Sequence, residues 1–186
     1  MQPIKTPVTS CILSWLDYCN YLHMGTPNSV IQTLQKIQNF AARLVLLAPR
    51  RHHSTPLLEK LPWLPISKRI KYMCSNAING PSLAYVLPGY NRSGWLGVKH
   101  QVTYLLAYLS ELLHVYTPSR TLRSSSDSRI LKIQQYKHKT HGFRTFSCFG
   151  PLIWNSLPQD LRHCSTLSSF KAKLKTFLFS QYFRPN

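Results

Sequence analysis

The sequence predicts a mainly α-helical protein, and three observations lead to this prediction. In three long segments, apolar residues recur at three- and four-residue steps, the period of one side of an α-helix. Proline or polar capping residues mark the ends of these segments. Of 186 residues, 44% are hydrophobic and 12% are aromatic, which is enough apolar material for a core. Only residues 130–136 suggest a strand, so the predicted fold is an irregular helical bundle with a basic loop or short hairpin.

The first long helix is predicted over residues 26–48. Thr26 is a suitable cap, Pro27 fits the first helical position, and Pro49 stops the run. The apolar residues Val30, Leu34, Ile37, Ala41, Leu44 and Leu47 recur at three- and four-residue steps, and polar residues fall on another face. A basic cluster of arginine and histidine follows at residues 50–53.

Two further helical elements follow this cluster. A short helix is predicted at residues 55–58, and the prolines of residues 61–65 predict a rigid apolar turn, since each proline fixes its own φ. A second long helix begins at Pro65 and ends at Asn79-Gly80. Its apolar side consists of Ile66, Ile70, Met73 and Ala77.

Residues 81–106 differ from the segments on either side. Four of the seven glycines lie at or in this stretch, and helical periodicity disappears. The tripeptide Leu-Ala-Tyr occurs on both sides, at residues 83–85 and 106–108. Because long loops without structure are unusual in compact domains, we expect a flexible insertion here. The chain then divides into a helical segment 1–80, the insertion 81–106, and a basic C-terminal segment 107–186.

The C-terminal segment is predicted to end in an amphipathic helix. A short amphipathic helix is expected over residues 105–113, followed by a polar and basic stretch 117–141 with a mobile serine-rich loop. Core aromatics return at Phe143, Phe146, Phe149 and Trp154, around a helical turn begun by Pro151. The last helix begins near Ser165 or Thr166, and its apolar stripe consists of Leu167, Phe170, Leu174, Phe177 and Leu178.

The charge of the chain is strongly unbalanced. Lys and Arg number 23 against 5 Asp and Glu, giving a formal net charge of +18 and an isoelectric point near 10.1. The expected partner is a polyanion, namely the backbone of RNA or DNA bound without sequence preference. The candidate nucleic-acid-binding residues are Lys36, Arg43, Arg50, Arg51, Arg120, Arg123, Arg129, Lys132, Lys137, Lys139 and Arg144. The alternative is a solvated basic surface without a dedicated partner.

The few carboxylates argue against catalysis. Two-metal polymerases and nucleases need acidic side chains that converge on cations about 4 Å apart, and no adjacent acidic pair exists in the chain. No nucleophile elbow, oxyanion loop or orienting carboxylate accompanies any Cys and His pair. We therefore expect no enzyme activity, no catalytic residue, no cofactor and no small-molecule substrate.

A zinc-binding module is a second alternative. His138, His141, Cys148, His163 and Cys164 fall within one segment, and two histidines three apart can share a turn. No recognised finger or knuckle spacing is present, and buried cysteines with solvated histidines are the more common arrangement.

The cysteines and the apolar stretches bear on the compartment. Five cysteines, an odd number without a Cys-x-x-Cys motif and without a secretory leader, indicate reduced thiols. The expected location is cytoplasmic or nuclear, not secreted. No stretch reaches the roughly 20 apolar residues of a membrane span, so no membrane partner is expected.

Several short motifs occur in a fixed order along the chain. They are Ser14-Trp15-Leu16-Asp17-Tyr18-Cys19-Asn20, then 34–44, then Leu61-Pro62-Trp63-Leu64-Pro65-Ile66 with Arg69-Ile70, then Asn79-Gly80, 108–113, 116–125, Trp154-Asn155-Ser156-Leu157-Pro158 with Leu161-Arg162, and 170–179. Together they resemble the C-terminal part of the reverse transcriptase of vertebrate LINE-type (non-LTR) retrotransposons, after the palm. The resemblance covers nearly all of the chain except residues 1–7 and the insertion.

The resemblance implies a truncated remnant of that enzyme. In the family, the catalytic aspartates lie upstream of the motif that contains Asp17, so no catalytic residue carries over. The helical region resembles the thumb, whose implied role is to hold template and primer. Trp15 stands where the family usually has a basic residue, and the stretch between the Leu-Ala-Tyr copies has no family counterpart.

The expected function is therefore that of an inactive fragment. We expect at most weak, sequence-independent affinity for RNA or single-stranded DNA. The alternative is a translated repeat fragment with no molecular function.

Overall fold

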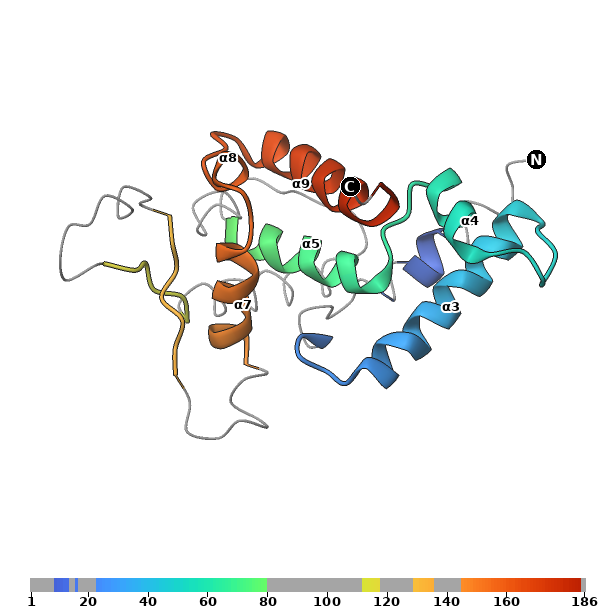
Figure 1. The fold of residues 1–186 in the computed structure, drawn as a ribbon, viewed down its shortest axis with the longest axis horizontal. Coiled ribbons are helices and arrows are strands. Elements are labelled where there is room, and N and C mark those ends of the chain that lie inside the picture. Colours follow the sequence, from blue (N-terminus) through green and yellow to red (C-terminus); the bar gives the residue numbers. More distant parts are fainter. Residues whose placement is uncertain are drawn as a thin grey trace, which may run out of the picture. The chain divides into compact units, whose positions relative to one another are not determined.

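The computed structural model describes residues 9–13, 16, 23–79, 112–117, 129–135 and 145–184 (Figure 1). Within this part of the chain 67% of residues are helical, in seven helices and no strands, which confirms the predicted mainly α fold. The predicted insertion, the boundaries at residues 80 and 106, the serine-rich loop and nearly all of the helix expected at 105–113 lie outside the described residues.

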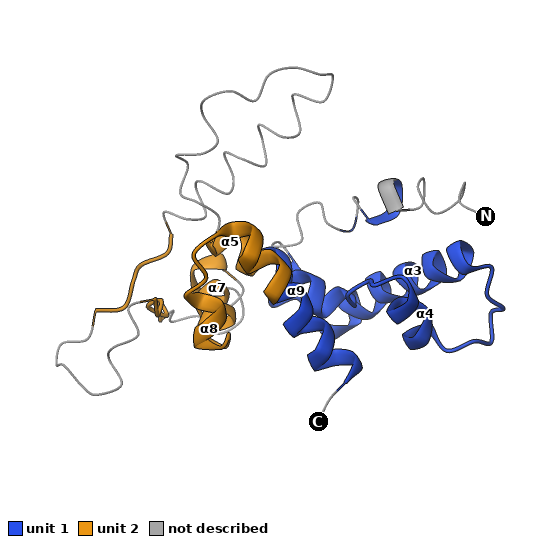
Figure 2. Ribbon diagram, turned by 90° about the horizontal axis from the view of Figure 1, so that it is seen from above, with its two compact units in different colours: residues 1–73, 174–186 blue, residues 74–173 orange. Residues whose placement is uncertain are grey.

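The chain forms two compact units, and each is described by itself. Unit 1 comprises residues 1–73 and 174–186, and unit 2 comprises residues 74–173 (Figure 2). Helices α5 (Ile66–Asn79) and α9 (Leu167–Phe183) each contribute residues to both units.

Unit 1 is built around helices α3 (Asn28–Leu46) and α4 (Ser54–Lys60). A π-helical turn, η1 (Thr9–Leu13), and the first part of α5 complete its N-terminal portion. Helix α3 packs against α4 and η1. These helices begin and end within about two residues of the predicted positions, because proline and turn residues punctuate the sequence there. Buried apolar side chains of unit 1 include Leu57, Leu58, Leu61, Trp63, Leu64, Ile66 and Ile70.

The predicted apolar row of α3 is only partly buried. Ala41 is buried as expected, but its buried neighbours are Gln38 and Ala42. Four residues of the predicted apolar row, Val30, Ile37, Leu44 and Leu47, are exposed. The buried side is defined by small side chains and by glutamine, because close packing and specific hydrogen bonds outweigh apolar character at this contact.

Two glutamines of α3 explain the buried polar side. Gln38, with 0% of its surface exposed, donates from Nε2 to the carbonyl of Leu64 at 2.8 Å. Oε1 of Gln35 accepts from the backbone N–H of Ile66 at 2.9 Å, and its Nε2 donates to Oε1 of Gln38 at 3.0 Å. Ile66 is the first residue of α5, where the backbone N–H has no partner within the helix. The two amides therefore fix the start of α5 against α3.

Helix α3 ends in a left-handed residue. Leu47 adopts φ 50° and ψ 36°, and its N–H bonds the carbonyls of Arg43 and Leu44. Glycine usually occupies this position, since a side chain in the left-handed region costs about 1–2 kcal/mol. Leu47 is also 67% exposed, so packing does little to offset this cost.

Unit 2 contains α7 (Phe146–Asn155), α8 (Gln159–Arg162) and the start of α9. Residues 114–116 and 130–132 form one antiparallel bridge, in which Tyr116 N donates to Ile130 O and Lys132 N donates to His114 O, both at 2.8 Å. The helical turn expected to begin at Pro151 begins at Phe146, and Pro151 lies inside the helix. Buried residues of unit 2 include Cys148, Ile153, Trp154, Leu161 and Phe170.

The last helix begins where the sequence predicts. Oγ1 of Thr166 accepts from the N–H of Ser169 at 3.2 Å, which is the hydrogen bond of an N-cap. Phe170, Leu174 and Leu178 of the predicted stripe are buried. Threonine at the cap and a regular apolar period were sufficient signals for this element.

Candidate nucleic-acid interface

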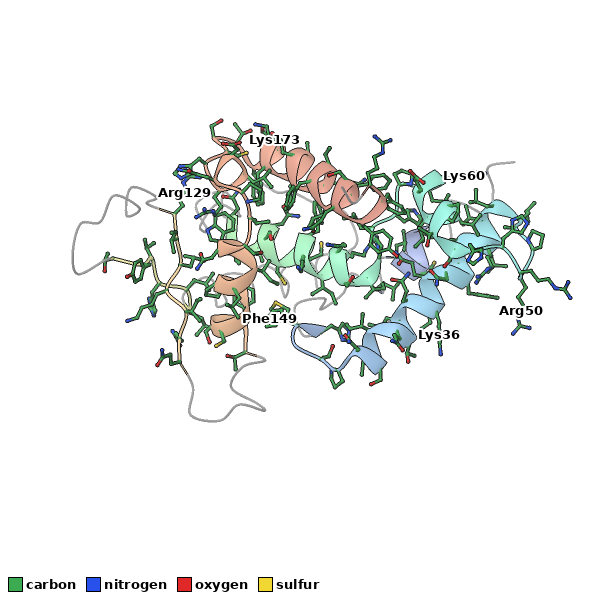
Figure 3. All side chains as sticks on the ribbon, in the orientation of Figure 1. Lys36, Arg50, Lys60, Arg129, Phe149 and Lys173 are labelled. Atoms are coloured by element: carbon green, nitrogen blue, oxygen red, sulfur yellow. The ribbon has the colours of Figure 1, made fainter. Side chains whose placement is uncertain are left out.

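The connection between α3 and α4 is the best-defined group of candidate residues. We call Arg50, Arg51, His52 and His53 the basic turn; all four are exposed. His52 N donates to Pro49 O at 3.0 Å, which closes the turn. Arg50 projects outward from the end of α3 (Figure 3). The structure records no hydrogen bond for the side chains of Arg50 and Arg51 within the described residues.

Arg43 has a different role from the one its charge suggested. Its Nη2 donates to the carbonyl of His52 at 3.2 Å, and the residue is only half-exposed. The guanidinium therefore ties the basic turn to the last turns of α3. It adds positive charge near Arg50 and Arg51 while holding their backbone in place.

Lys36 lies on the same helix as Arg43. It is exposed, and it lies seven residues before Arg43, which is about 10 Å along the helix axis. Its ammonium group is free to turn toward an anion that approaches α3.

The two described candidates in unit 2 also differ from each other. Nη1 of Arg129 donates to the carbonyl of Arg162 at 2.6 Å and to that of Cys164 at 3.4 Å, so this guanidinium binds carbonyls at the end of α8. Lys132 is exposed. Arg129 is thus mainly a structural cation, and Lys132 is the more available of the two.

Helix α7 supplies the contacts that hold the segment 129–135. Nε1 of Trp154 donates to the carbonyl of Arg129 at 2.6 Å. The side chain of Asn155 bonds both backbone groups of Leu131, accepting at 3.0 Å and donating at 2.9 Å. The Trp-Asn motif therefore has a structural role in unit 2.

The predicted residues do not form one described group. Lys36, Arg43, Arg50 and Arg51 belong to unit 1, and Arg129 and Lys132 belong to unit 2. The remaining candidates lie outside the described residues: Arg120, Arg123, Lys137, Lys139 and Arg144. Lys36 lies within α3, and the basic turn follows the end of the same helix.

Sequence reasoning left several exposed cations out of the candidate set. They are Lys60, Lys171, Lys173, Lys175 and Arg184, and Lys60 and Lys173 are labelled in Figure 3. The four-residue spacing of Lys171 and Lys175 was the available signal. Near the start of α5, desolvation and then the neighbouring charge of Lys71 lower the pKa of Lys68.

Acidic side chains are scarce in the part of the chain that the structure describes. Only Glu59 and Asp160 are acidic there; both are exposed, and one belongs to each unit. Neither unit's described part therefore offers two carboxylates for a shared pair of cations. The same scarcity leaves the exposed lysines and arginines with few possible ion-pair partners.

The zinc hypothesis finds little support in the geometry of Cys148. Its Sγ donates to the carbonyl of Gln134 at 3.0 Å, and burial raises the pKa of its thiol. Zinc binds the thiolate, so both effects oppose ligation. His138 and His141 lie outside the described residues, and no cluster of three or more His, Cys, Asp or Glu suited to a metal occurs among those described.

Comparisons of the chain with protein-family models, with curated proteins and with solved structures found no match. Among the described residues, no helix combines the length and apolar character that crossing a membrane requires.

Proposed function

We propose that this chain is an inactive remnant of a LINE-type reverse transcriptase that binds the phosphate backbone of RNA or single-stranded DNA without sequence preference. The observation that carries the proposal is the basic turn. Arg50 and Arg51 are exposed side by side, and the bond from Arg43 to the carbonyl of His52 holds the turn that presents them. Arginine forks bind phosphate oxygens with two parallel hydrogen bonds.

The electrostatics of the whole chain support the same proposal. A net charge of +18 attracts any polyanion, and the described residues contain only two acids that could compete with phosphate. Contacts to phosphate carry no sequence information, so the expected binding does not distinguish one sequence from another.

The proposed absence of catalysis follows from the same scarcity of acids. The resemblance assigns no catalytic aspartate to this chain, and the described part of each unit holds a single acidic residue. Primer extension with magnesium and a template–primer duplex should therefore show no incorporation of nucleotides. Incorporation above that of a protein-free control would contradict this part of the proposal.

A filter-binding titration across salt concentrations tests the binding. Lys36, Arg50 and Arg51 would neutralise about three phosphates, which gives a slope of about −2 or steeper in a plot of log K against log salt for a single strand. Single-stranded RNA and DNA of unrelated sequences should bind alike. Absence of binding at low salt, or a flat salt dependence, would overturn the proposal.

A translated repeat with no molecular function would also attract nucleic acid through its charge. Such diffuse attraction depends on how many charges are present and hardly on where they lie. The two hypotheses therefore differ in the effect of removing equal charge from different places on the chain.

A further inference from the structure

The exposed side of α3 and the residue that follows it carry a row of large apolar side chains. We call Val30, Ile37, Phe40, Leu44 and Leu47 the α3 stripe; their exposed fractions are 40%, 45%, 61%, 42% and 67%. Five of the nine large hydrophobic residues that are exposed in the described part of the chain belong to this one row. Scattered apolar residues on a surface need no explanation, but large apolar residues gathered on one side of a helix mark an interaction surface.

The spacing of the stripe identifies the kind of structure that fits it. Val30, Ile37 and Leu44 are seven residues apart, and Thr33 and Phe40 lie at the intervening steps of three and four. These are the a and d positions of a heptad, whose side chains insert between those of one facing helix. Leu47 follows as the left-handed residue at the end of α3. From Val30 to Leu44 the row spans about 21 Å along α3, which is the length of two heptads.

One flank of the stripe is closed and the other is basic. The e positions on one flank include Ala41, which is fully buried in unit 1. The g positions on the other flank are Ser29, Lys36 and Arg43, and Arg50 and Arg51 follow the end of the helix. Helix α3 has no acidic residue. A facing helix would therefore meet positive charge along its only open flank.

This charge decides between possible occupants. Two copies of the chain paired through the stripe in antiparallel fashion would bring Lys36 and Arg43 of one copy toward those of the other. In parallel pairing, the e positions of each copy would have to face the basic g positions of the other copy. The e side is already packed within unit 1. Each copy also carries a net charge of +18. A second copy is thus disfavoured, whereas an acidic partner gains from the same charges.

We propose that the α3 stripe binds an amphipathic helix of another protein, whose apolar heptad positions face the stripe and whose glutamates or aspartates face Lys36 and Arg43. The two helices would pair as a short two-stranded coiled coil. Phe40 lies near the centre of the stripe and Leu44 lies one turn further along the helix, and the pair provides its main contacts, since large side chains near the middle of an interface dominate binding.

Synthetic three-heptad peptides test this proposal on the full chain. One peptide has leucine at the apolar heptad positions and glutamate on both flanks; a second has lysine on the flanks; a third has the composition of the first in scrambled order. Binding is measured by fluorescence anisotropy at about 0.15 M salt. The glutamate peptide should bind at least about tenfold more tightly than the other two.

Variants of α3 give the matched control. Phe40→Ser with Leu44→Ser should weaken binding of the glutamate peptide by at least about tenfold. Gln32→Ser, at an exposed position of the same helix outside the stripe, should change it by less than about twofold. All three positions are exposed, and circular dichroism checks that the helix content is unchanged.

Several results would overturn the proposal. One is that the glutamate peptide does not bind. Another is that the Phe40 and Leu44 variant binds this peptide as well as the original chain does. A third is that the scrambled peptide binds equally well, through charge alone. If sedimentation shows that the original chain is a dimer and that the Phe40 and Leu44 variant is a monomer, the stripe binds a second copy instead. Binding to anionic lipid vesicles with the same residue dependence, without peptide binding, would assign it to a membrane surface.

Discussion

At the scale of single residues, amide side chains bind backbone groups that no helix or strand satisfies. Gln38 and Gln35 bond the backbone of Leu64 and Ile66 in unit 1, and Asn155 bonds Leu131 in unit 2. A buried backbone group left without a partner costs about 1–3 kcal/mol, so each of these side chains matters more than its polarity suggests.

Truncation of Gln38 tests this point in unit 1. Gln38→Ala leaves the carbonyl of Leu64 without its bond and removes a buried side chain, so the free energy of unfolding should fall by about 2–3 kcal/mol. Gln32→Ala, on the exposed side of the same helix, should change it by less than about 0.5 kcal/mol. Urea titrations measure both; equal effects of the two substitutions would refute the proposed role of Gln38.

Substitution of the left-handed residue at the end of α3 is expected to stabilise the chain, in contrast to truncation of Gln38. Leu47→Gly relieves a cost of about 1–2 kcal/mol at φ 50°, partly offset by the greater freedom of glycine in the unfolded chain. The free energy of unfolding should rise by about 0.5–1 kcal/mol in urea titrations. A decrease would mean that the exposed Leu47 side chain makes contacts that outweigh the backbone strain.

The thiols of the chain should differ in reactivity. Burial raises the pKa of Cys74 to about 12, whereas Cys11 is exposed. The thiolate is the reactive form, so at pH 8 an alkylating reagent should modify Cys11 rapidly and Cys74 only as fast as the chain unfolds. Mass spectrometry of a time course measures both sites. Rapid labelling of Cys74 in the folded chain would show that its surroundings are open.

At the scale of elements, helix boundaries could be predicted and the orientation of α3 could not. Pro49, Pro65 and Thr166 act through local backbone chemistry, which the sequence displays directly. The buried side of α3 depends on Gln38 and Gln35, whose partners lie 26 and 31 residues away. A helical period shows that an apolar row exists, but it does not show whether that row faces the core or solvent.

The candidate site also has one part that the sequence predicts and another that only the structure shows. The exposed basic turn could be predicted as a cluster from Arg50 and Arg51 alone. The positioning role of Arg43 and the structural role of Arg129 could not, because each guanidinium binds a backbone carbonyl that only the folded chain brings within reach. Charge identifies a cation in the sequence, but its availability depends on nearby acceptors.

The contact between α7 and the segment 129–135 can be tested at this scale. Asn155→Ala removes the partner of both backbone groups of Leu131, and the free energy of unfolding should fall by about 1–3 kcal/mol. Amide hydrogen exchange at Leu131 should become faster. Ser156→Ala, at the exposed neighbouring residue, is the control and should leave the Leu131 amide unchanged. Unchanged exchange in Asn155→Ala would show that the segment is held by other contacts.

At the scale of the whole molecule, the excess of positive charge acts in two ways. It favours association with polyanions, and it disfavours association between copies of the chain. The basic turn and the α3 stripe lie along one helix and its C-terminal end, so one element of unit 1 combines the proposed phosphate contacts with the proposed helix-binding surface. The two proposals share Lys36, but their tests change different side chains, Arg50 and Arg51 in one and Phe40 and Leu44 in the other, so the proposals can fail independently.

The central claim is that nucleic acid binds at the basic turn rather than to diffuse charge. Two double variants remove the same charge from different places: Arg50→Gln with Arg51→Gln, and Lys171→Gln with Lys175→Gln, all at exposed positions. Filter binding of a single-stranded oligonucleotide at fixed salt compares them. The arginine variant should bind at least about tenfold more weakly than the original chain, and the lysine variant less than about threefold more weakly. Equal losses in the two variants would contradict a defined site and favour diffuse attraction.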